Sequence, residues 1–511
     1  MAVDASGNTY TTGRIFNGRV HDWLTVKTDP NGQELWRSIV AGDATTERLT
    51  ASLAVSFAAN DARMVKLDQH GNVYVVGTTT LREPTLSRRC TLLKYSKDGT
   101  EIWRVNPPLP SAPFQYSESA CFRLTLDANG DVILSGSVGL TAAPRIEDAY
   151  VSKVSAAGVP QWSDVVSTAY DQRLSVGGPV TTDDFGNVYV VNSLQIERLD
   201  YDWAARKLNG LTGAQIWRRD GGSVGLRDSP TSLIVSPSND KLAISWAEEW
   251  PSSPITGFAV WSFLDSSNGN LLHARKMGHS NSDGSPSGSA LPGGVAFDVD
   301  GSSVIAATVS RAAPASGDIR IEKLAGNYST VWQLIEAVDS KNESVMALAL
   351  HRPTQMIIVA GAMGVEFGGA SVTNAYALHV NAINGVVNSR HERPGSGGVR
   401  DRYLAVGFDA AGNSYVAGNV SDAARMNFAQ MKLDNSGGLA WSQFLGTVSG
   451  PAQLGAQFSS DQTHAAKEAF KLDALGNSYV ALRVYRGFRD GRATHEMQVQ
   501  KHDALGQRLW S

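Results

Sequence analysis

Residues 62–77 read ARMVKLDQHGNVYVVG, and residues 90–106 read CTLLKYSKDGTEIWRVN. Each stretch holds two short apolar runs joined by a tight turn, which is the pattern of a β-hairpin. In the first turn Asp68 stands three residues ahead of Gly71. Aspartate can hydrogen-bond the backbone two residues on, and glycine accepts a positive φ. The second stretch repeats the device at Asp98 and Gly99. The two stretches therefore predict four successive strands.

The first turn recurs along the whole chain. Clear copies begin at Asp4, Asp68, Asp127, Asp183, Asp409 and Asp473, and degenerate copies lie near 236, 297 and 351. A second signature has a Lys two residues before a turn Asp, then a Gly, then a Trp four residues later. It is complete at Lys27–Trp36, Lys432–Trp441 and Lys501–Trp510. Partial copies contain Trp103, Trp162, Trp217 and Trp332, and the slots near 265–273 and 379–388 lack the Trp.

Tandem units of four short strands are what a β-propeller requires, because each sheet buries its faces against the neighbouring blades. We therefore predict an all-β propeller of about nine units of roughly 57 residues. The recurrent Trp residues, from Trp36 to Trp441, should pack between blades. The predicted units are 1–40, 62–106, 120–166, 178–221, 231–277, 293–336, 345–391, 403–446 and 468–511 of a single domain, 1–511.

Both ends of the chain fall within a repeat unit. Unit one enters at Met1–Asp4, where unit two has a longer lead, and unit nine stops at Ser511 directly after its Trp. Closed propellers usually have about four to eight blades. The first interpretation is therefore a ring of nine blades that closes where the first and last blades dock. The alternatives are an eight-bladed ring with an extra unit and a fragment of a longer array.

The two signatures together resemble a known repeat family. D-x-x-G-N-x-Y-V-x-G followed by K-x-D-x-x-G-x-x-x-W is similar to the bacterial β-propeller repeat called SBBP. Its Trp-ending half is also similar to the quinoprotein-like (PQQ-like) propeller repeat. The resemblance covers essentially the whole chain and implies the propeller fold. It implies little about function, because the shared residues form turns and packing contacts.

Composition limits the classes of partner and compartment. The net charge of −4 and the pI near 6.2 argue against nucleic acid, since no domain-wide basic surface exists to neutralise phosphates. No apolar run reaches the length that spans a bilayer. The given sequence shows no signal-peptide pattern, but this says little about the compartment, because the first unit begins within a repeat. The two cysteines, Cys90 and Cys121, are predicted to be free buried thiols on strands at different radii, with a disulfide as the alternative.

Motifs that carry chemistry are scarce in the sequence. It contains no C-x-x-C, H-E-x-x-H, G-x-x-x-x-G-K-[ST] or G-x-S-x-G. Asp298 and Asp300 resemble the start of a calcium loop, but no glutamate follows at the EF-hand spacing. A plain hairpin turn is the favoured interpretation of this segment, and calcium is the alternative. No catalytic or cofactor-binding residue is predicted.

The connections between strands point to one face of each unit. Within a unit the first and third turns are short, whereas the other connections are long: 78–89, 106–119, 137–148, 275–292, 446–467 and 483–494. A partner should therefore meet the long-loop face. The candidate contact residues are Phe114, Tyr116, Trp250, Tyr485, Arg486 and Phe488. The alternative is that these side chains fold back onto the blades.

Three functional hypotheses follow. The first is a non-catalytic binding or scaffold module, secreted, at the cell surface or periplasmic, that binds a protein or a glycan. The second is a quinoprotein-like dehydrogenase, which by resemblance would need an axial cofactor, calcium and usually a vicinal cysteine pair. The third is a polysaccharide-acting propeller enzyme with carboxylates converging on the axis. The first is favoured, because every recurring residue already has a structural reason.

Overall fold

The structure is a computed structural model of the chain. It describes residues 1–16, 21–41, 60–81, 87–111, 113–140, 146–168, 175–250, 256–279, 290–310, 317–337, 342–367, 370–393, 401–422, 425–445, 452–454, 468–489 and 492–511. Strands dominate these residues, and helix is confined among them to Glu468 and Ala469. The all-β prediction is confirmed.

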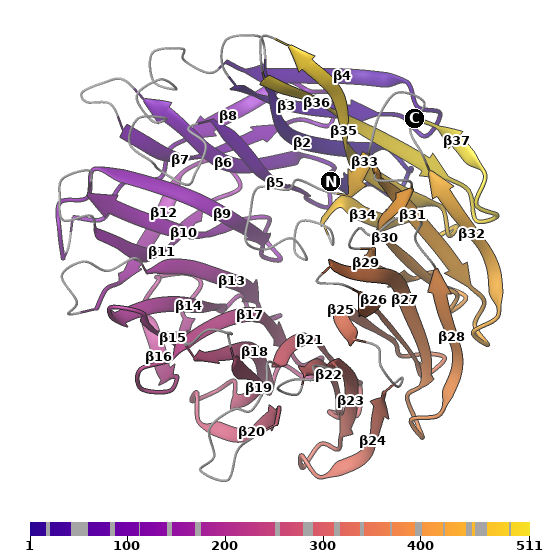
Figure 1. Cartoon of the computed structure of the whole chain (residues 1–511). Coiled ribbons are helices and arrows are strands. Elements are labelled where there is room, and N and C mark those ends of the chain that lie inside the picture. Colours follow the sequence, from indigo (N-terminus) through magenta and orange to yellow (C-terminus); the bar gives the residue numbers. More distant parts are fainter. Residues whose placement is uncertain are drawn as a thin grey trace. The chain divides into compact units, whose positions relative to one another are not determined.

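The described strands form nine sets, which we call blades 1 to 9 in chain order (Figure 1). Blades 1 to 3 contain β1 (Ala2–Val3), β2 (Thr9–Phe16), β3 (His21–Thr28), β4 (Glu34–Val40), β5 (Asp61–Leu67), β6 (Val73–Leu81), β7 (Ser87–Tyr95), β8 (Glu101–Val105), β9 (Glu118–Leu126), β10 (Val132–Leu140), β11 (Ile146–Val154) and β12 (Pro160–Val166). Blades 4 to 6 contain β13 (Val176–Thr182), β14 (Val188–Glu197), β15 (Asp200–Leu208), β16 (Gln215–Gly221), β17 (Arg227–Val235), β18 (Lys241–Trp250), β19 (Thr256–Asp265), β20 (Leu271–Met277), β21 (Ala290–Phe297), β22 (Ser303–Ser310), β23 (Gly317–Leu324) and β24 (Thr330–Glu336). Blades 7 to 9 contain β25 (Asn342–His351), β26 (Met356–Phe367), β27 (Ala370–Asn381), β28 (Val387–Arg393), β29 (Arg402–Phe408), β30 (Ser414–Asp422), β31 (Arg425–Leu433), β32 (Leu439–Leu445), β33 (Ala452–Leu454), β34 (Phe470–Leu472), β35 (Ser478–Arg489), β36 (Arg492–His502) and β37 (Arg508–Trp510).

Each blade is an antiparallel sheet in which consecutive strands are neighbours, as in β1-β2-β3-β4. Blades 4 and 5 join into one larger sheet through a parallel contact between Tyr201 and Arg227, and in blade 9 both β33 and β34 pair with β35. The multi-blade β-propeller prediction is therefore confirmed at the level of the blades. By internal contacts the chain divides into two compact units. One is Met1–Val235, Asn239–Ile244 and Phe263–Leu272, and the other is Ser236–Ser238, Ser245–Ser262 and His273–Ser511.

Successive blades within each unit bury apolar faces against one another. In the first unit, one core cluster contains Val76 and Leu92 of blade 2 together with Leu124 and Leu134 of blade 3, all at most 3% exposed. In the second unit, equivalent clusters lie between blades 6 and 7, 7 and 8, and 8 and 9. Because both faces of these sheets are covered, their strands are near-continuous apolar runs.

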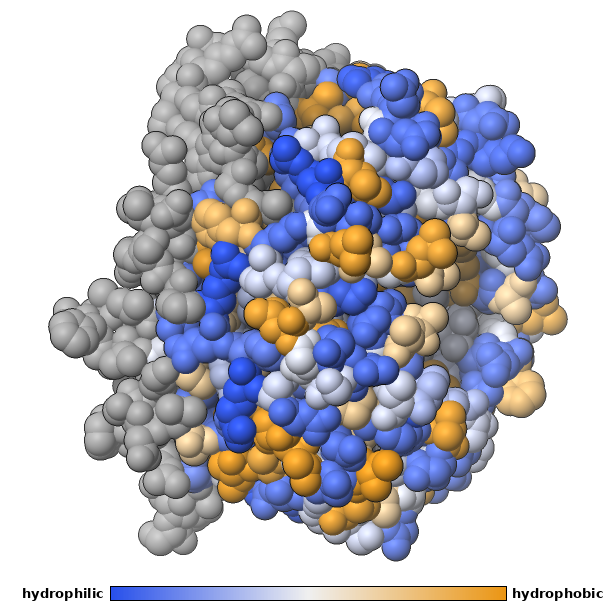
Figure 2. All heavy atoms as spheres, turned by 90° about the vertical axis from the view of Figure 1, so that its right-hand side faces the viewer, coloured by the Kyte–Doolittle hydropathy of each residue, from blue (hydrophilic) through white to orange (hydrophobic). Residues whose placement is uncertain are grey.

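The outermost strand of a blade alternates between the neighbouring blade and solvent. In β4 the exposed side chains are Glu34, Leu35, Arg37 and Ile39, and Ile102 and Val331 are likewise about half exposed in β8 and β24. On the face drawn in Figure 2, apolar residues occur in small groups among hydrophilic ones. Scattered apolar residues of this kind are normal for a protein surface.

Strands run longer than expected on the side of the predicted long loops. Pairing continues to Leu81 with Ser87, to Leu140 with Ile146, and to Arg489 with Arg492. The predicted loops 78–89, 137–148 and 483–494 are therefore largely arms of β-hairpins, and that prediction is wrong. Repeat signals mark only the turns, whereas these arms are defined by cross-strand pairing. Segments 280–289 and 455–467 of the other predicted loops lie outside the described residues.

Candidate functional site

The recurrent Asp organises each of the first turns. The Asp68 carboxylate accepts hydrogen bonds from the amides of His70 and Asn72, from the Asn72 side chain at 2.8 Å and from the Tyr74 hydroxyl at 3.3 Å. Burial opposes ionisation, but the hydrogen bonds prevail and hold the pKa of Asp68 below its usual range. Gly71 has a φ of 78°, as the turn requires.

The recurrent Trp binds the next blade. Its indole nitrogen donates to a carbonyl in that blade's second short turn, at 3.0 to 3.2 Å. The pairs are Trp36–Lys97, Trp103–Ala156, Trp162–Gly210, Trp217–Ser266, Trp332–Ala382 and Trp441–Ala504. At the junction between blades 4 and 5, Lys207 and Tyr189 donate to the same Ser266 carbonyl. We call this set of donors the clamp.

The clamp also explains the recurrent turn glycine. A Cβ added to Gly99 would lie 2.6 Å from the Trp36 ring, and one added to Gly269 would lie 2.7 Å from Trp217. Both glycines have positive φ, at 88° and 73°. The Trp residues lie between blades as predicted, but burial is partial: Trp217 is 7% exposed, whereas the other five are half-buried.

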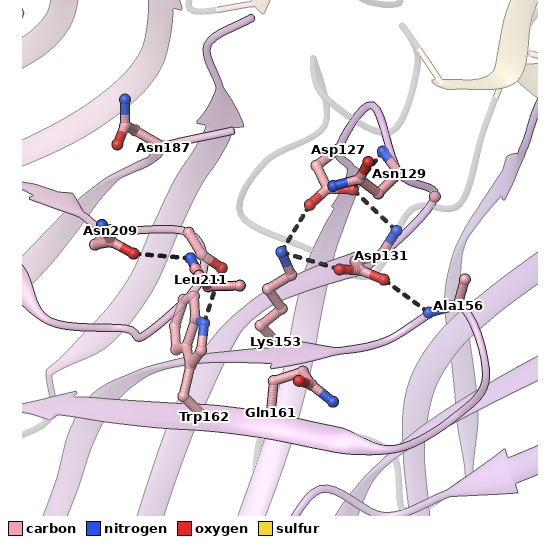
Figure 3. Close-up of polar contacts among 12 residues, drawn as sticks. Asp127, Asn129, Asp131, Lys153, Ala156, Gln161, Trp162, Asn187, Asn209 and Leu211 are labelled. Carbon is pink, nitrogen blue, oxygen red and sulfur yellow. Dashed lines mark hydrogen bonds and ion pairs between the residues drawn. The ribbon is translucent and has the colours of Figure 1, made fainter. Parts of the chain in front are cut away.

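Blade 3 carries a charged variant of the first turn (Figure 3). Asp131 occupies the position of the usual Asn, and Ile133 that of the Tyr. Lys153 lies between two carboxylates, 2.7 Å from Asp127 and 3.0 Å from Asp131, and is 5% exposed. Burial disfavours the ammonium, but these hydrogen bonds hold its pKa above the usual value. This buried triad, in which Lys153 and Asp127 are buried and Asp131 is partly exposed, takes the place of the Asn and Tyr hydrogen bonds to the turn Asp in the other blades.

The predicted loop residues Phe114 and Tyr116 pack on blades 2 and 3. Tyr116 is 6% exposed, its hydroxyl donates to Asp148, and its ring meets Phe114 edge-on with centroids 6.1 Å apart. The same region buries Arg88, whose guanidinium donates to Glu118. These rings are thus held against the fold, which agrees with the alternative considered for them.

The remaining predicted contact residues are placed differently. Trp250 ends β18 with 36% of its surface exposed. The backbones of Tyr485, Arg486 and Phe488 belong to β35, so they lie in a strand and not in a loop. Their side chains lie outside the described residues. Partner binding by this set stays a prediction.

The two cysteines form a disulfide, so the prediction of free thiols is wrong. Cys90 of β7 and Cys121 of β9 are bonded with Cα atoms 5.1 Å apart, and both are fully buried. The error has a geometric cause: β9 of blade 3 packs beside β7 of blade 2, and the Cys90 amide donates to Ser119. The bond therefore ties two blades together.

Removing this disulfide should destabilise the first unit. Its cysteines are 31 residues apart, and a loop of that size contributes about 3–4 kcal/mol through the entropy of the unfolded chain. We expect Cys90→Ala with Cys121→Ala to lower the melting temperature, as should reductant for the unmutated chain. The check is thermal unfolding, combined with alkylation of the denatured, unreduced protein. Rapid alkylation of both thiols there would contradict the assignment.

The calcium alternative concerns the first turn of blade 6. Asp298 lies 3.6 Å from the Lys323 ammonium and accepts a hydrogen bond from the Val299 amide, while Asp300 accepts one from Ser302. The backbone has the hairpin geometry of the other turns, because the Asp298 amide donates to the Ser302 carbonyl and the Gly301 amide to the Asp298 carbonyl. Among the described residues, no group of three or more His, Cys, Asp or Glu is placed to hold a metal ion. Calcium binding at Asp298 and Asp300 stays a prediction.

His502 should make the stability of the second unit depend on pH. It is fully buried in β36, and burial together with Arg508 lowers its pKa from 6.5 to about 4, although Asp503 opposes the shift. The unfolded chain binds the proton more readily than the folded chain. The free energy of unfolding is therefore at its full value above about pH 6.5 and falls by about 3 kcal/mol as the pH drops to about 4. Denaturant unfolding across this range should show the loss, and His502→Gln should flatten it. An unchanged slope in the variant would contradict this.

The sequence reasoning missed an acidic cluster in blades 4 and 5. A Cβ added to Gly222 would lie 2.0 Å from Asp202 Oδ1 and 2.8 Å from Asp228 Oδ2, so these carboxylates converge there. Burial, and then the negative charges of Asp200 and Asp220, raise the pKa of Asp202 to about 6. No motif marks this cluster, because its residues come from different strands.

In the described part of the chain, no helix is long and apolar enough to cross a membrane.

Comparisons with known proteins give remote likenesses. No protein-family model matches the chain, and no curated protein does. A europium-containing methanol dehydrogenase is 10% identical with a TM-score of 0.43, over 95% of this chain and 85% of that one. The quinohemoprotein alcohol dehydrogenase from Comamonas testosteroni is 12% identical with a TM-score of 0.44, over 87% and 76%. The C-terminal WD40 domain of Sif2 is 9% identical with a TM-score of 0.39, over 81% and 96%. Likenesses this remote carry no conclusion about function.

Proposed function

We propose that the chain is a non-catalytic binding or scaffold β-propeller. The observation that carries the proposal is that the recurrent polar side chains are used inside the fold: Asp holds the turns, and the Lys, Tyr and Trp donors of the clamp join blades. At the Ser266 carbonyl, for instance, Tyr189, Lys207 and Trp217 all serve the same junction. A repeat whose polar residues are used inside the fold acts as a rigid frame, and its variable connections are left for recognition.

We place the partner, a protein or a glycan, at the end of each blade opposite its first and third turns. The antiparallel order of each blade puts its first and third turns at one end and the other connections at the opposite end. Trp250, at the end of β18, offers a partly exposed ring there for stacking. Secretion, or placement at the cell surface or in the periplasm, is supported by the buried disulfide, because disulfides persist in oxidising compartments.

A binding array tests the proposal. The purified chain is applied to glycan and peptide arrays, and any hit is measured again with variants shortened in 446–467 or 483–494 and with Trp250→Ala. We expect binding to be lost in at least one of these variants. Leu211→Ser is the matched control, because Leu211 is 83% exposed in a short turn at the opposite end.

A parallel assay separates this proposal from catalysis. The same preparation is screened for quinone-linked alcohol oxidation and for cleavage of a polysaccharide panel. Turnover that one carboxylate substitution abolishes, while the fold survives, would overturn the non-catalytic proposal. Binding that survives both loop deletions but is lost in Leu211→Ser would move the partner to the short-turn end.

A further inference from the structure

Blade 7 departs from the clamp at every position. By strand register, Ile358 pairs with His379 and His379 pairs with Ser389. In blade 8 the corresponding pairs are Tyr415 with Lys432 and Lys432 with Trp441. His379 therefore stands where the other clamps have Lys, and Ser389 where they have Trp. The turn Asp is also replaced, by Arg352, since the Gln355 amide donates to the Arg352 carbonyl as Gly412 does to Asp409.

The replacement brings an imidazole against the next blade. A Cβ added to Gly437, in the second short turn of blade 8, would lie 2.7 Å from His379 Nδ1 and 2.6 Å from Ser389 Oγ. His379 is fully buried, and neither ring nitrogen has a hydrogen-bond partner among the described residues. The turn thus closes directly over an unpaired, titratable ring.

Two other ionisable groups face this ring. Asp434 belongs to the same turn of blade 8, and its carboxylate already accepts the amides of Ser436 and Gly438. His391, from β28, lies with Nε2 3.0 Å from the Gly437 carbonyl and 3.1 Å from Ser389 Oγ. At the junctions with a recurrent Trp, the indole contacts the second short turn of the next blade. In blade 7, His391 makes the equivalent contact.

We propose that the junction between blades 7 and 8 is a pH-sensitive latch, closed while His379 is neutral and loosened when His379 gains a proton. The clamps with Lys stay charged throughout this pH range, because a lysine loses its proton only in alkaline solution. In blade 1, Lys27 and Trp36 both donate to the Lys97 carbonyl of blade 2, and this junction is expected not to respond. The junctions held by Lys and Trp should therefore not share the acid response of the latch.

The physical cause is the burial of the ring. An imidazolium needs partners for two N–H groups, and a buried charge without them is costly. Burial lowers the pKa of His379, and His391 lowers it further, while Asp434 acts in the opposite direction. Because this pKa lies below that of the unfolded chain, the closed junction is fully stable above about pH 6.5 and weakens as the pH falls below it. When the turn at 434–438 moves away from the ring, water reaches the imidazolium and can hydrogen-bond to it.

Hydrogen exchange of the full chain tests the latch. Exchange in 434–438 is compared with exchange in 96–99, the matched turn at the junction held by Lys27 and Trp36, at about pH 7.5 and about pH 5. After correction for intrinsic rates, we expect at least about tenfold faster exchange in acid for the first turn and no change for the second.

Two variants decide the cause. His379→Gln keeps a polar, uncharged side chain and should abolish the acid response at 434–438. Lys27→His should create an acid response at 96–99. If His379→Gln keeps the response, or if exchange of the unmutated chain does not change with pH, the proposal is wrong. Parallel acceleration at 434–438 and 96–99 would mean that acid loosens the chain generally, which would also overturn the proposal.

Discussion

Replacing Lys153 by alanine is expected to lower the free energy of unfolding by about 3–5 kcal/mol. Lys153 is 5% exposed, and its ammonium lies within 3.0 Å of the carboxylates of both Asp127 and Asp131. Without it, the buried Asp127 carboxylate and the partly exposed Asp131 carboxylate lie close together with no cation between them. Denaturant unfolding measured by tryptophan fluorescence is the check.

A second substitution shows whether charge is the cause. Asp131→Asn gives blade 3 the amide that the other turns have, so the double variant Lys153→Ala with Asp131→Asn should be more stable than Lys153→Ala alone. As a surface control, Arg104→Ala should cost less than about 1 kcal/mol, because the Arg104–Glu101 pair is solvent-exposed. Equal costs for Lys153→Ala and Arg104→Ala would contradict the buried triad.

Replacing Trp217 by alanine should also cost about 3–5 kcal/mol, as for other large buried rings. The loss includes the contact of the ring with the turn at Gly269 and the hydrogen bond of 3.0 Å to the Ser266 carbonyl. Gly269→Ala should destabilise the same junction from the other side, since its Cβ would lie 2.7 Å from the indole at a φ of 73°.

Trp250→Ala is the matched control for this experiment. Its ring is 36% exposed at the end of β18, so its loss should cost clearly less than the loss of Trp217. Comparable losses of stability in the two variants, measured by denaturant unfolding, would mean that the clamp is not what makes Trp217 important.

The candidate site was less predictable than the fold. Phe114, Tyr116 and Trp250 were chosen as aromatic residues outside the repeat, yet Tyr116 is buried against Asp148. Only some of the positions at which blade 7 departs from the repeat could be identified from the sequence. The missing Trp was visible in the sequence, but the placement of His379 against Gly437 depends on two blades meeting.

The sequence by itself determined the all-β class, the turns and the succession of four-stranded blades. Each of these features is local: Asp68, Gly71 and Asn72 form a turn from neighbouring residues, and the period of the repeat carries the pattern along the chain. Trp217 could be assigned to a junction because its spacing from the turn glycine is fixed.

Only the tertiary structure decided which residues far apart in the sequence meet. The Cys90–Cys121 disulfide depends on which strands of successive blades pack side by side, and the Lys153 triad depends on how far one side chain reaches toward a turn 22 residues earlier, at Asp131. Hairpin arms as long as β35 are likewise set by pairing with β36. Such contacts join residues that no local pattern connects, so their geometry follows from how the blades pack.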